Sequence, residues 1–141
     1  MTSRSAPIRV MLADDDPIFV EVASAALRRM DCAVVVADDG AAALHALLQD
    51  EFDVALVDLS MPHVDGFRLI GMIRATSRLS RLPIMVLTVR DDAEAIEEAR
   101  RLGVDDFMTK PVNWGRFRLR LLQVVAASRS APSQRAAIAR R

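Results

Sequence analysis

Short apolar segments alternate with longer segments of mixed polarity along most of this chain. Apolar runs lie at 8–13, 33–37, 53–58, 83–88 and 105–110, and four of them are rich in β-branched residues or leucine. Short runs rich in apolar residues indicate strands buried on both faces. The pattern therefore predicts five buried β-strands.

The segments between these runs have helical length and a helical spacing of apolar residues. In the first of them, Ile18, Val22, Ala25 and Ala26 recur at intervals that place them on one helix face, which we expect to be buried. Asp16 followed by Pro17 predicts an N-cap with proline at the first helical position. The predicted helices are 17–30, 39–49, 66–76, 91–102 and 113–127.

Five strand–helix repeats in about 120 residues predict an α/β fold. Parallel strands need crossover connections, and right-handed crossovers place helices on both faces of the sheet. The expected architecture is a doubly wound, five-stranded parallel sheet between helices. We expect one domain at 8–128, a short N-terminal leader at 1–7 and an Arg-rich C-terminal tail or linker at 129–141.

Composition is typical of a globular domain rather than a membrane or disulfide-rich protein. The chain has 141 residues, 52% of them hydrophobic and 27% charged, and no apolar run approaches the ~18 residues that span a bilayer. The N-terminus has no apolar segment of the signal-peptide type, so we expect a cytoplasmic location without membrane contact. Cys32 is the single cysteine and lies in an apolar run, which predicts a buried, unreactive thiol.

Charge is divided unevenly although the net charge is zero. Residues 1–111 carry twelve basic and nineteen acidic groups, a net charge of −7, whereas 112–141 carry seven arginines and no acid. A basic end of this kind contacts nucleic acid, an acidic partner or only solvent, and we favour a solvent-exposed linker. We expect no nucleic-acid binding by this domain alone, because no helix-turn-helix pattern follows. Lys110 is the only lysine beside eighteen arginines, which singles it out.

Polar residues collect where the predicted strands end. In a parallel sheet these ends meet at one edge, and ligands bind there. Clustered carboxylates favour a hard cation such as Mg²⁺, and an ammonium and a hydroxyl beside them would complete a pocket for a phosphoryl group. The residues at this edge are Asp14, Asp15, Asp16, Asp58, Thr88 and Lys110.

Four sequence segments resemble the receiver domain of bacterial two-component response regulators. They are VMLADDDP at the first strand, LVDLSMPHVDGFRLI around Asp58, IMVLT at the fourth strand and GVDDFMTKPVNW at the fifth. The resemblance covers about 8–127. It implies a flavodoxin-like (βα)5 fold with strand order 2-1-3-4-5, and a cis peptide between Lys110 and Pro111.

The resemblance also assigns roles to the acidic residues. Asp58 would accept a phosphoryl group from a sensor histidine kinase or a phosphotransfer protein. Asp14 and Asp15 would hold Mg²⁺ together with Asp58 and the main-chain carbonyl of Ser60, and Mn²⁺ could replace Mg²⁺. The domain would catalyse its own phosphorylation and dephosphorylation without being an enzyme that turns over a separate substrate.

Switch residues follow from the same resemblance. Thr88 and Lys110 would bond phosphoryl oxygens, and Phe107 occupies the position of the aromatic switch residue, which is more commonly Tyr. Their movement would repack the surface made by the last two predicted helices and the strand between them. Ser60, Val89 and Arg90 would tune the lifetime of the phosphoryl group.

The sequence indicates how the domain would be phosphorylated more clearly than what it would then act on. The switched surface would act on a downstream effector or a C-terminal output domain, and it could also form a homodimer. The segment KPVNW followed by RFRLRLL is similar to receivers that precede a domain for cyclic-dinucleotide synthesis or hydrolysis.

Two alternatives remain at this point. A haloacid-dehalogenase-type phosphatase would use Asp14 as the nucleophile and Asp16 as the acid/base, but it predicts Thr or Val where this chain has Ile18. It also leaves the motif around Asp58 unexplained. An interaction module of the same fold that is never phosphorylated would be expected to lose at least one key site residue, and none is lost.

Overall fold

The predicted alternation of strands and helices is present throughout the computed structural model, which describes residues 6–130. The largest difference is at the last helix, which continues to Ser130, three residues beyond the expected end at 127. The strands are β1 (Ile8–Ala13), β2 (Cys32–Ala37), β3 (Val54–Val57), β4 (Ile84–Thr88) and β5 (Asp106–Thr109). The helices are α1 (Pro17–Arg29), α2 (Gly40–Gln49), α3 (Gly66–Ala75), α4 (Ala93–Arg101) and α5 (Trp114–Ser130).

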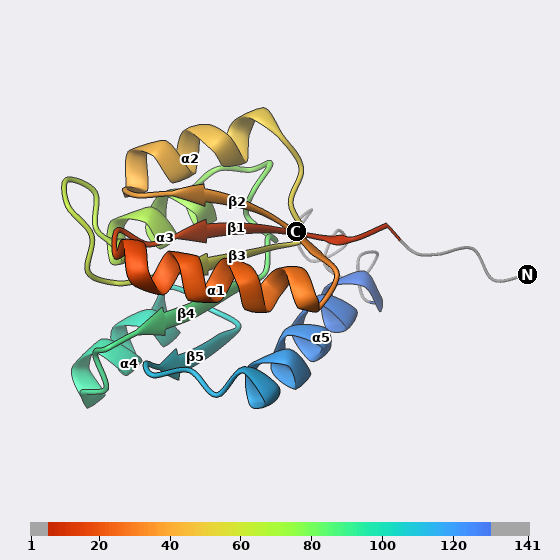
Figure 1. Ribbon diagram of the computed structural model, residues 1–141. Coiled ribbons are helices and arrows are strands. Elements are labelled where there is room, and N and C mark those ends of the chain that lie inside the picture. Colours follow the sequence, from red (N-terminus) through yellow and green to blue (C-terminus); the bar gives the residue numbers. More distant parts are fainter. Residues whose placement is uncertain (1–5, 131–141) are drawn as a thin grey trace, which may run out of the picture.

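The strands form one parallel sheet in the order β2-β1-β3-β4-β5, which confirms the expected fold and order. Leu12 in β1 is paired with Val36 in β2 and with Leu56 in β3, so β1 is held on both sides. Figure 1 shows the sheet with its strands pointing in one direction and the helices packed around it. All five strands therefore end at the same edge.

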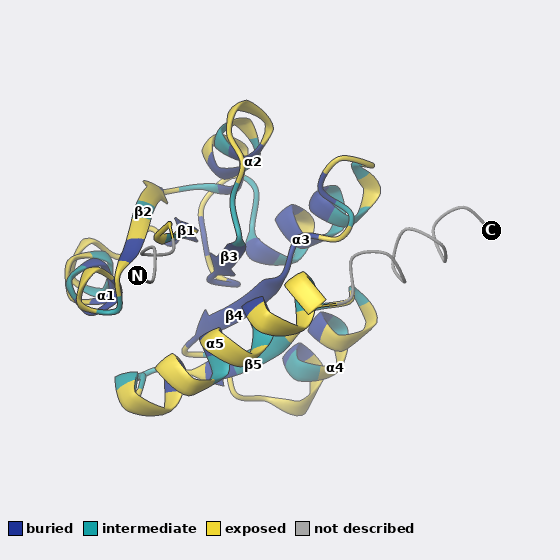
Figure 2. Ribbon diagram, turned by 90° about the vertical axis from the view of Figure 1, so that its right-hand side faces the viewer, coloured by how far each residue is buried: buried dark blue, intermediate teal, exposed yellow. Residues whose placement is uncertain are grey.

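Two apolar clusters fill the space between the sheet and the helices. One cluster joins the strands to α2, α3 and α4, through residues such as Leu47, Ile70 and Ala99. The other joins the opposite sheet face to α1 and α5, through Leu27 and Phe117. Strands β3 and β4 are buried along their whole length, as Figure 2 shows, which agrees with their prediction as apolar runs. Strands β2 and β5 lie at the edges of the sheet and are only partly buried, so the prediction of buried strands was wrong for these two.

The buried face of α1 differs from the predicted one. Ile18 is 75% exposed and Val22 is 51% exposed, so the expectation that they face the core was wrong. Ala23 and Leu27 are buried in place of these two residues, whereas Ala26 is buried as expected. Both stripes have the spacing of one helix face, and only packing against β1 and α5 selects between them. The exposed stripe then leaves apolar surface beside the edge where the strands end.

Each helix starts with a side-chain cap close to that edge. The N-cap Asp16 accepts hydrogen bonds from the backbone N–H groups of Ile18 and Phe19, as predicted. Caps of this kind contribute about 1 kcal/mol each because they satisfy N–H groups that have no partner within the helix. The same arrangement recurs at Asp39, Asp65, Asp92 and Asn113.

The two ends of the expected domain lie partly outside the described residues. Of the expected leader at 1–7, only Ala6 and Pro7 are described, and of the expected tail at 129–141 only Arg129 and Ser130, which continue α5. Within 6–130, no helix has the length and apolar character needed to span a bilayer.

Two glycines of α3 provide a matched test of the packing at its start. A Cβ on Gly66 would overlap the carbonyl oxygen of Asp58 and lie 2.6 Å from Leu59 Cα, whereas a Cβ on Gly71 meets nothing within 4 Å. We expect Gly66→Ala to lower the free energy of unfolding by about 1–3 kcal/mol. Gly71→Ala should raise it by about 0.5–1 kcal/mol, because alanine favours the helix. Urea unfolding of both variants measures this, and a Gly66→Ala variant as stable as the parent would contradict the close approach.

Candidate active site

Three carboxylates lie together where β1 and β3 end. One oxygen from each of Asp14, Asp15 and Asp58 lies within 4.8 Å of the others. Asp14 is 1% exposed and Asp58 is 7% exposed, whereas Asp15 is exposed. Backbone hydrogen bonds from Asp14 N to Ala37 O and from Asp58 N to Ala13 O continue the sheet past the ends of the strands. Pairing within the sheet therefore fixes the backbone positions from which the two buried side chains, those of Asp14 and Asp58, extend.

Lys110 supplies the positive charge for this cluster. Its Nζ lies 2.7 Å from Asp14 Oδ2 and 3.4 Å from Asp58 Oδ2, and its side chain is 10% exposed. The residue directly follows β5, and its backbone N–H donates to Thr88 O at 2.8 Å. Its peptide bond to Pro111 is cis, as expected. The ammonium thus joins the ends of β1, β3 and β5, which are far apart in sequence.

Burial gives Asp14 an unusual titration. Loss of water around the carboxylate raises its pKa above the ordinary value of 3.8, and the negative charge of Asp58 adds to that rise. The hydrogen bond from Lys110 and the one from the N–H of Asp16 offset only part of the increase. Since the pKa remains raised, keeping Asp14 ionised at neutral pH lowers the free energy of unfolding. A cation beside Asp14 would relieve that cost.

Thr88 and Ser60 come from the ends of two neighbouring strands, with Thr88 at the end of β4 and Ser60 in the loop after β3. Thr88 ends β4, is 0% exposed, and its Oγ1 accepts a hydrogen bond from Arg90 N at 3.3 Å. Ser60 is exposed, and its N–H donates to Asp58 Oδ1 at 3.4 Å. Asp58 therefore has one oxygen near Lys110 and the other near the backbone of its own loop.

The two residues that directly follow Thr88, Val89 and Arg90, have different surroundings. Val89 is 68% exposed. The guanidinium of Arg90 forms an ion pair with Asp92 at 3.0 Å and lies over the ring of Phe67, with Cζ 5.7 Å from the ring centroid. Arg90 is thus held at the beginning of α4, while Val89 is open to solvent.

Phe107 is half-buried on β5 and packs against the cluster formed with α2, α3 and α4. It is paired with Val86 of β4, two residues before Thr88. This places it on the strand between α4 and α5, where the sequence analysis expected a switch residue.

A groove beside Lys110 was not predicted from the sequence. It has a volume of about 410 Å³ and is mainly apolar, with Lys110 at its border. The signal that could have identified it is the pair Ile18 and Val22, which were assigned to the core. The residues lining the groove are Asp16, Ile18, Phe19, Val22, Val89, Lys110, Pro111, Val112 and Trp114.

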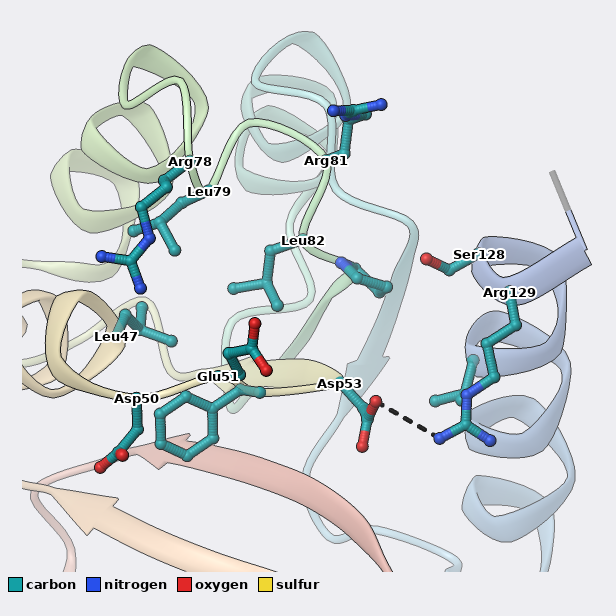
Figure 3. A pocket seen from close by; sticks show the side chains of 13 residues that line it. Leu47, Asp50, Glu51, Asp53, Arg78, Leu79, Arg81, Leu82, Ser128 and Arg129 are labelled. Atoms are coloured by element: carbon teal, nitrogen blue, oxygen red, sulfur yellow. Dashed lines mark ion pairs between the residues drawn. The ribbon is translucent and has the colours of Figure 1, made fainter. Parts of the chain in front are cut away.

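A second hollow lies at the opposite end of the sheet, between the loops before β3 and β4 and the end of α5 (Figure 3). It has a volume of about 460 Å³ and contains the ion pair between Asp53 and Arg129, at 3.3 Å. None of the predicted site residues lines it. Its size therefore does not identify the chemistry of this protein.

Cys32 fits its predicted role as an unreactive core residue. It is 6% exposed in the cluster with α1 and α5. Burial, with the charges of Asp31 and Asp53, raises the pKa of its thiol to about 11. The thiol is protonated at neutral pH and cannot act as a nucleophile there.

Comparison with known proteins identifies relatives of the chain. A family described as "Response regulator receiver domain" matches residues 10–122. Sensor protein GacS of Pseudomonas syringae pv. syringae is 36% identical over 108 residues, which are 74% of this chain and 12% of that protein. The probable transcriptional regulatory protein TcrX of Mycobacterium tuberculosis is 31% identical over 115 residues, 82% of this chain and 48% of that protein. The chain thus spans about half or less of the length of these two relatives.

A solved structure matches the fold over most of the chain. It is the receiver domain of sensor histidine kinase PA1611 from Pseudomonas aeruginosa PAO1, with a magnesium ion coordinated in its active site cleft. Its TM-score is 0.80 and its sequence is 26% identical, and the match covers 86% of this chain and 99% of that one.

The upward pKa shift of Asp14 predicts the effect of removing its charge. In EDTA, we expect Asp14→Asn to raise the midpoint of thermal unfolding by a few degrees, because the amide keeps the shape without the cost of burying a charge. The difference should shrink as the pH falls through the raised pKa of Asp14 toward the ordinary value of 3.8, because the parent carboxyl then takes up a proton in the folded protein. Calorimetry of the variant and of the matched Asp15→Asn, an exposed carboxylate with a smaller expected gain, tests this. A lowered midpoint in Asp14→Asn would mean that the bond to Lys110 outweighs the burial.

Proposed function

The chain belongs to the response regulator receiver domain family, and we propose that Asp58 is the residue that accepts the phosphoryl group. The observation that carries the proposal is the position of Lys110 Nζ, 2.7 Å from Asp14 and 3.4 Å from Asp58. A buried ammonium between two carboxylates is well suited to an acceptor that becomes more negative on reaction. The donor is a phosphohistidine on a sensor histidine kinase or a phosphotransfer protein.

The transfer itself requires one bond to form and one to break. A carboxylate oxygen of Asp58 attacks the phosphorus, the phosphorus–nitrogen bond of the donor breaks, and the leaving imidazole keeps the electron pair and takes up a proton. Asp58 becomes an acyl phosphate. Lys110 stabilises the negative charge of the phosphoryl oxygens, and Thr88 donates its hydroxyl hydrogen to another of them.

The three carboxylates fit a magnesium site. Asp14, Asp15 and Asp58, with the main-chain carbonyl of Ser60, offer the all-oxygen ligand set that Mg²⁺ prefers, and Mn²⁺ is a possible substitute. The raised pKa of Asp14 supports this assignment, because a cation relieves the cost of its burial. When bound, the ion would supply positive charge that offsets the negative charge of the entering phosphoryl group. The magnesium ion in the cleft of the PA1611 receiver domain is further support.

Phosphorylation would shift the population of two conformations. A phosphoryl group gives the hydroxyl of Thr88 a partner in one of them, so Thr88 moves inward and Phe107 repacks. Since Phe107 lies on β5, the surface of α4, β5 and α5 changes. Couplings of this kind are typically about 1–3 kcal/mol, which biases the equilibrium without locking it.

Residues beside the pocket are proposed to set the lifetime of the phosphoryl group. They are Ser60, Val89 and Arg90. Val89 is larger than the alanine or glycine common at its position and lines the groove that borders Lys110. Although it is exposed, we propose that it hinders the approach of water to a phosphoryl group on Asp58. We expect phosphorylated Val89→Ala to lose its phosphoryl group faster than the parent, and equal lifetimes would exclude Val89 from this role.

Partners are assigned to two different surfaces. The phosphodonor must reach Asp58 and would therefore cover the apolar groove that borders Lys110. The surface of α4, β5 and α5 would act on a downstream effector, on a second copy of the chain or on an output domain such as a cyclic-dinucleotide enzyme. We assign 8–128 to the receiver, 1–7 to a leader and 129–141 to a tail or linker.

The haloacid-dehalogenase-type phosphatase has less support than the phosphoacceptor, because its proposed acid/base residue serves as a helix cap. Asp16 is exposed, and its carboxylate accepts the N–H groups of Ile18 and Phe19 as the cap of α1. An unphosphorylated interaction module remains the second candidate. The experiment below decides between it and the proposed phosphoacceptor.

Intact mass spectrometry tests the acceptor directly. Incubated with acetyl phosphate and Mg²⁺, the parent should gain one phosphoryl group. Asp58→Asn should gain none, because an amide is not nucleophilic enough, and EDTA added beforehand should prevent the reaction. Asp53→Asn is the matched control, since Asp53 lies at the other end of the sheet, and it should react like the parent. An adduct that persists in Asp58→Asn would overturn the assignment, and no adduct in the parent would favour the interaction module.

A further inference from the structure

Lys110 has an aromatic contact besides its two carboxylates. Its Nζ lies 3.9 Å from the centroid of the Phe19 ring. The face of an aromatic ring carries negative potential, and an ammonium within about 6 Å of the centroid is attracted to it. With its side chain only 10% exposed, the ammonium has little water to compete with this attraction.

Phe19 is held firmly enough to position another group. Its backbone N–H donates to the cap Asp16 at 3.4 Å, in the first turn of α1. Its ring contacts Trp114, with centroids 6.0 Å apart, and Trp114 packs edge-on against Phe117 at 5.3 Å. Phe117 is 0% exposed. A series of ring contacts thus connects Phe19 in α1 through Trp114 to the buried Phe117 in α5.

The two carboxylates do not hold the ammonium equally. Nζ is closer to Asp14 than to Asp58, by 2.7 Å against 3.4 Å. A lysine side chain has a flexible four-carbon stem, so the ammonium follows the strongest charge. A bound cation would compete for both carboxylates and weaken their hold on Lys110. The attraction of a neutral ring does not depend on those carboxylates.

We propose that Phe19 is a positioning residue that holds the ammonium of Lys110 beside Asp58 through a cation–π contact. This inference rests on the proposed function, because its effect on the reaction is measured through phosphorylation of Asp58. The contact itself can be measured separately, since Lys110 is the only lysine of the chain.

The first measurement observes the contact without any reaction. Protein labelled with ¹³C and ¹⁵N in lysine alone gives a single lysine spin system. Protons above a ring face are shifted upfield, so we expect the side-chain protons of Lys110 to resonate upfield in the parent and to return to ordinary values in Phe19→Leu. Resonances at ordinary values in the parent, or unchanged by Phe19→Leu, would overturn the proposal.

The second measurement links the contact to the reaction. Phenylalanine carrying one, two or three fluorines at position 19 progressively weakens the potential of the ring face while nearly keeping its shape. The rate of phosphorylation by acetyl phosphate in Mg²⁺ should fall stepwise with each fluorine, and by about 3- to 30-fold in Phe19→Leu. Circular dichroism verifies that each variant is folded, and the near-isosteric fluorinated proteins test the idea even if Phe19→Leu is unstable.

Phe52 offers a matched control ring. It lies at the other end of the sheet, where Arg9 Cζ is 5.4 Å from its centroid, and the same fluorine series there should leave the rate unchanged. A rate that is constant across the series at position 19 would overturn the positioning role. A parent that takes up no phosphoryl group would overturn the proposed function and the positioning role together, while the lysine resonance would still report whether the contact exists.

Discussion

The contact of one buried ammonium with two buried carboxylates is the interaction on which the site depends. Lys110 reaches Asp14 and Asp58 from the end of a third strand, so the contact exists only if β1, β3 and β5 end at the same edge. Without the ammonium, two carboxylates that are at most 7% exposed would repel each other. Its compensation is incomplete, as the raised pKa of Asp14 indicates. A site that holds excess negative charge before phosphorylation favours the binding of a cation. Burial of that charge lowers the stability of the fold.

The surroundings of Lys110 connect the chemistry to two different surfaces. Through β5, the lysine is continuous with Phe107 and with the face formed by α4 and α5. Through Phe19 it touches α1 and the apolar groove where a phosphodonor would bind. Lys110 therefore meets the proposed entry of the phosphoryl group through its side chain and the strand of the proposed output surface through its backbone. The larger hollow at the opposite end of the sheet has neither connection.

The sequence predicted the elements well because strand ends, caps and breakers are local signals. Apolar runs identified all five strands, and the segment around Asp58 identified the family and, through it, the strand order. The burial of Ile18 was predicted wrongly, because helical spacing defines a stripe but not which stripe the sheet covers. The contact of Phe19 with Lys110 could not be predicted for a related reason. It depends on how α1 is rotated against residues far away in sequence.

Replacing Lys110 with arginine separates charge from shape at the centre of the site, because the positive charge is kept while the compact ammonium is lost. We expect Lys110→Arg to fold but to be phosphorylated more slowly, since a planar guanidinium cannot keep the contacts to Asp14, Asp58 and Phe19 in a space that leaves the lysine 10% exposed. The amide resonances of α4 and β5 should also change less on phosphorylation than in the parent. A variant that reacts at the parent's rate, with the full change in those resonances, would show that only the positive charge at position 110 matters and that the shape of the ammonium does not.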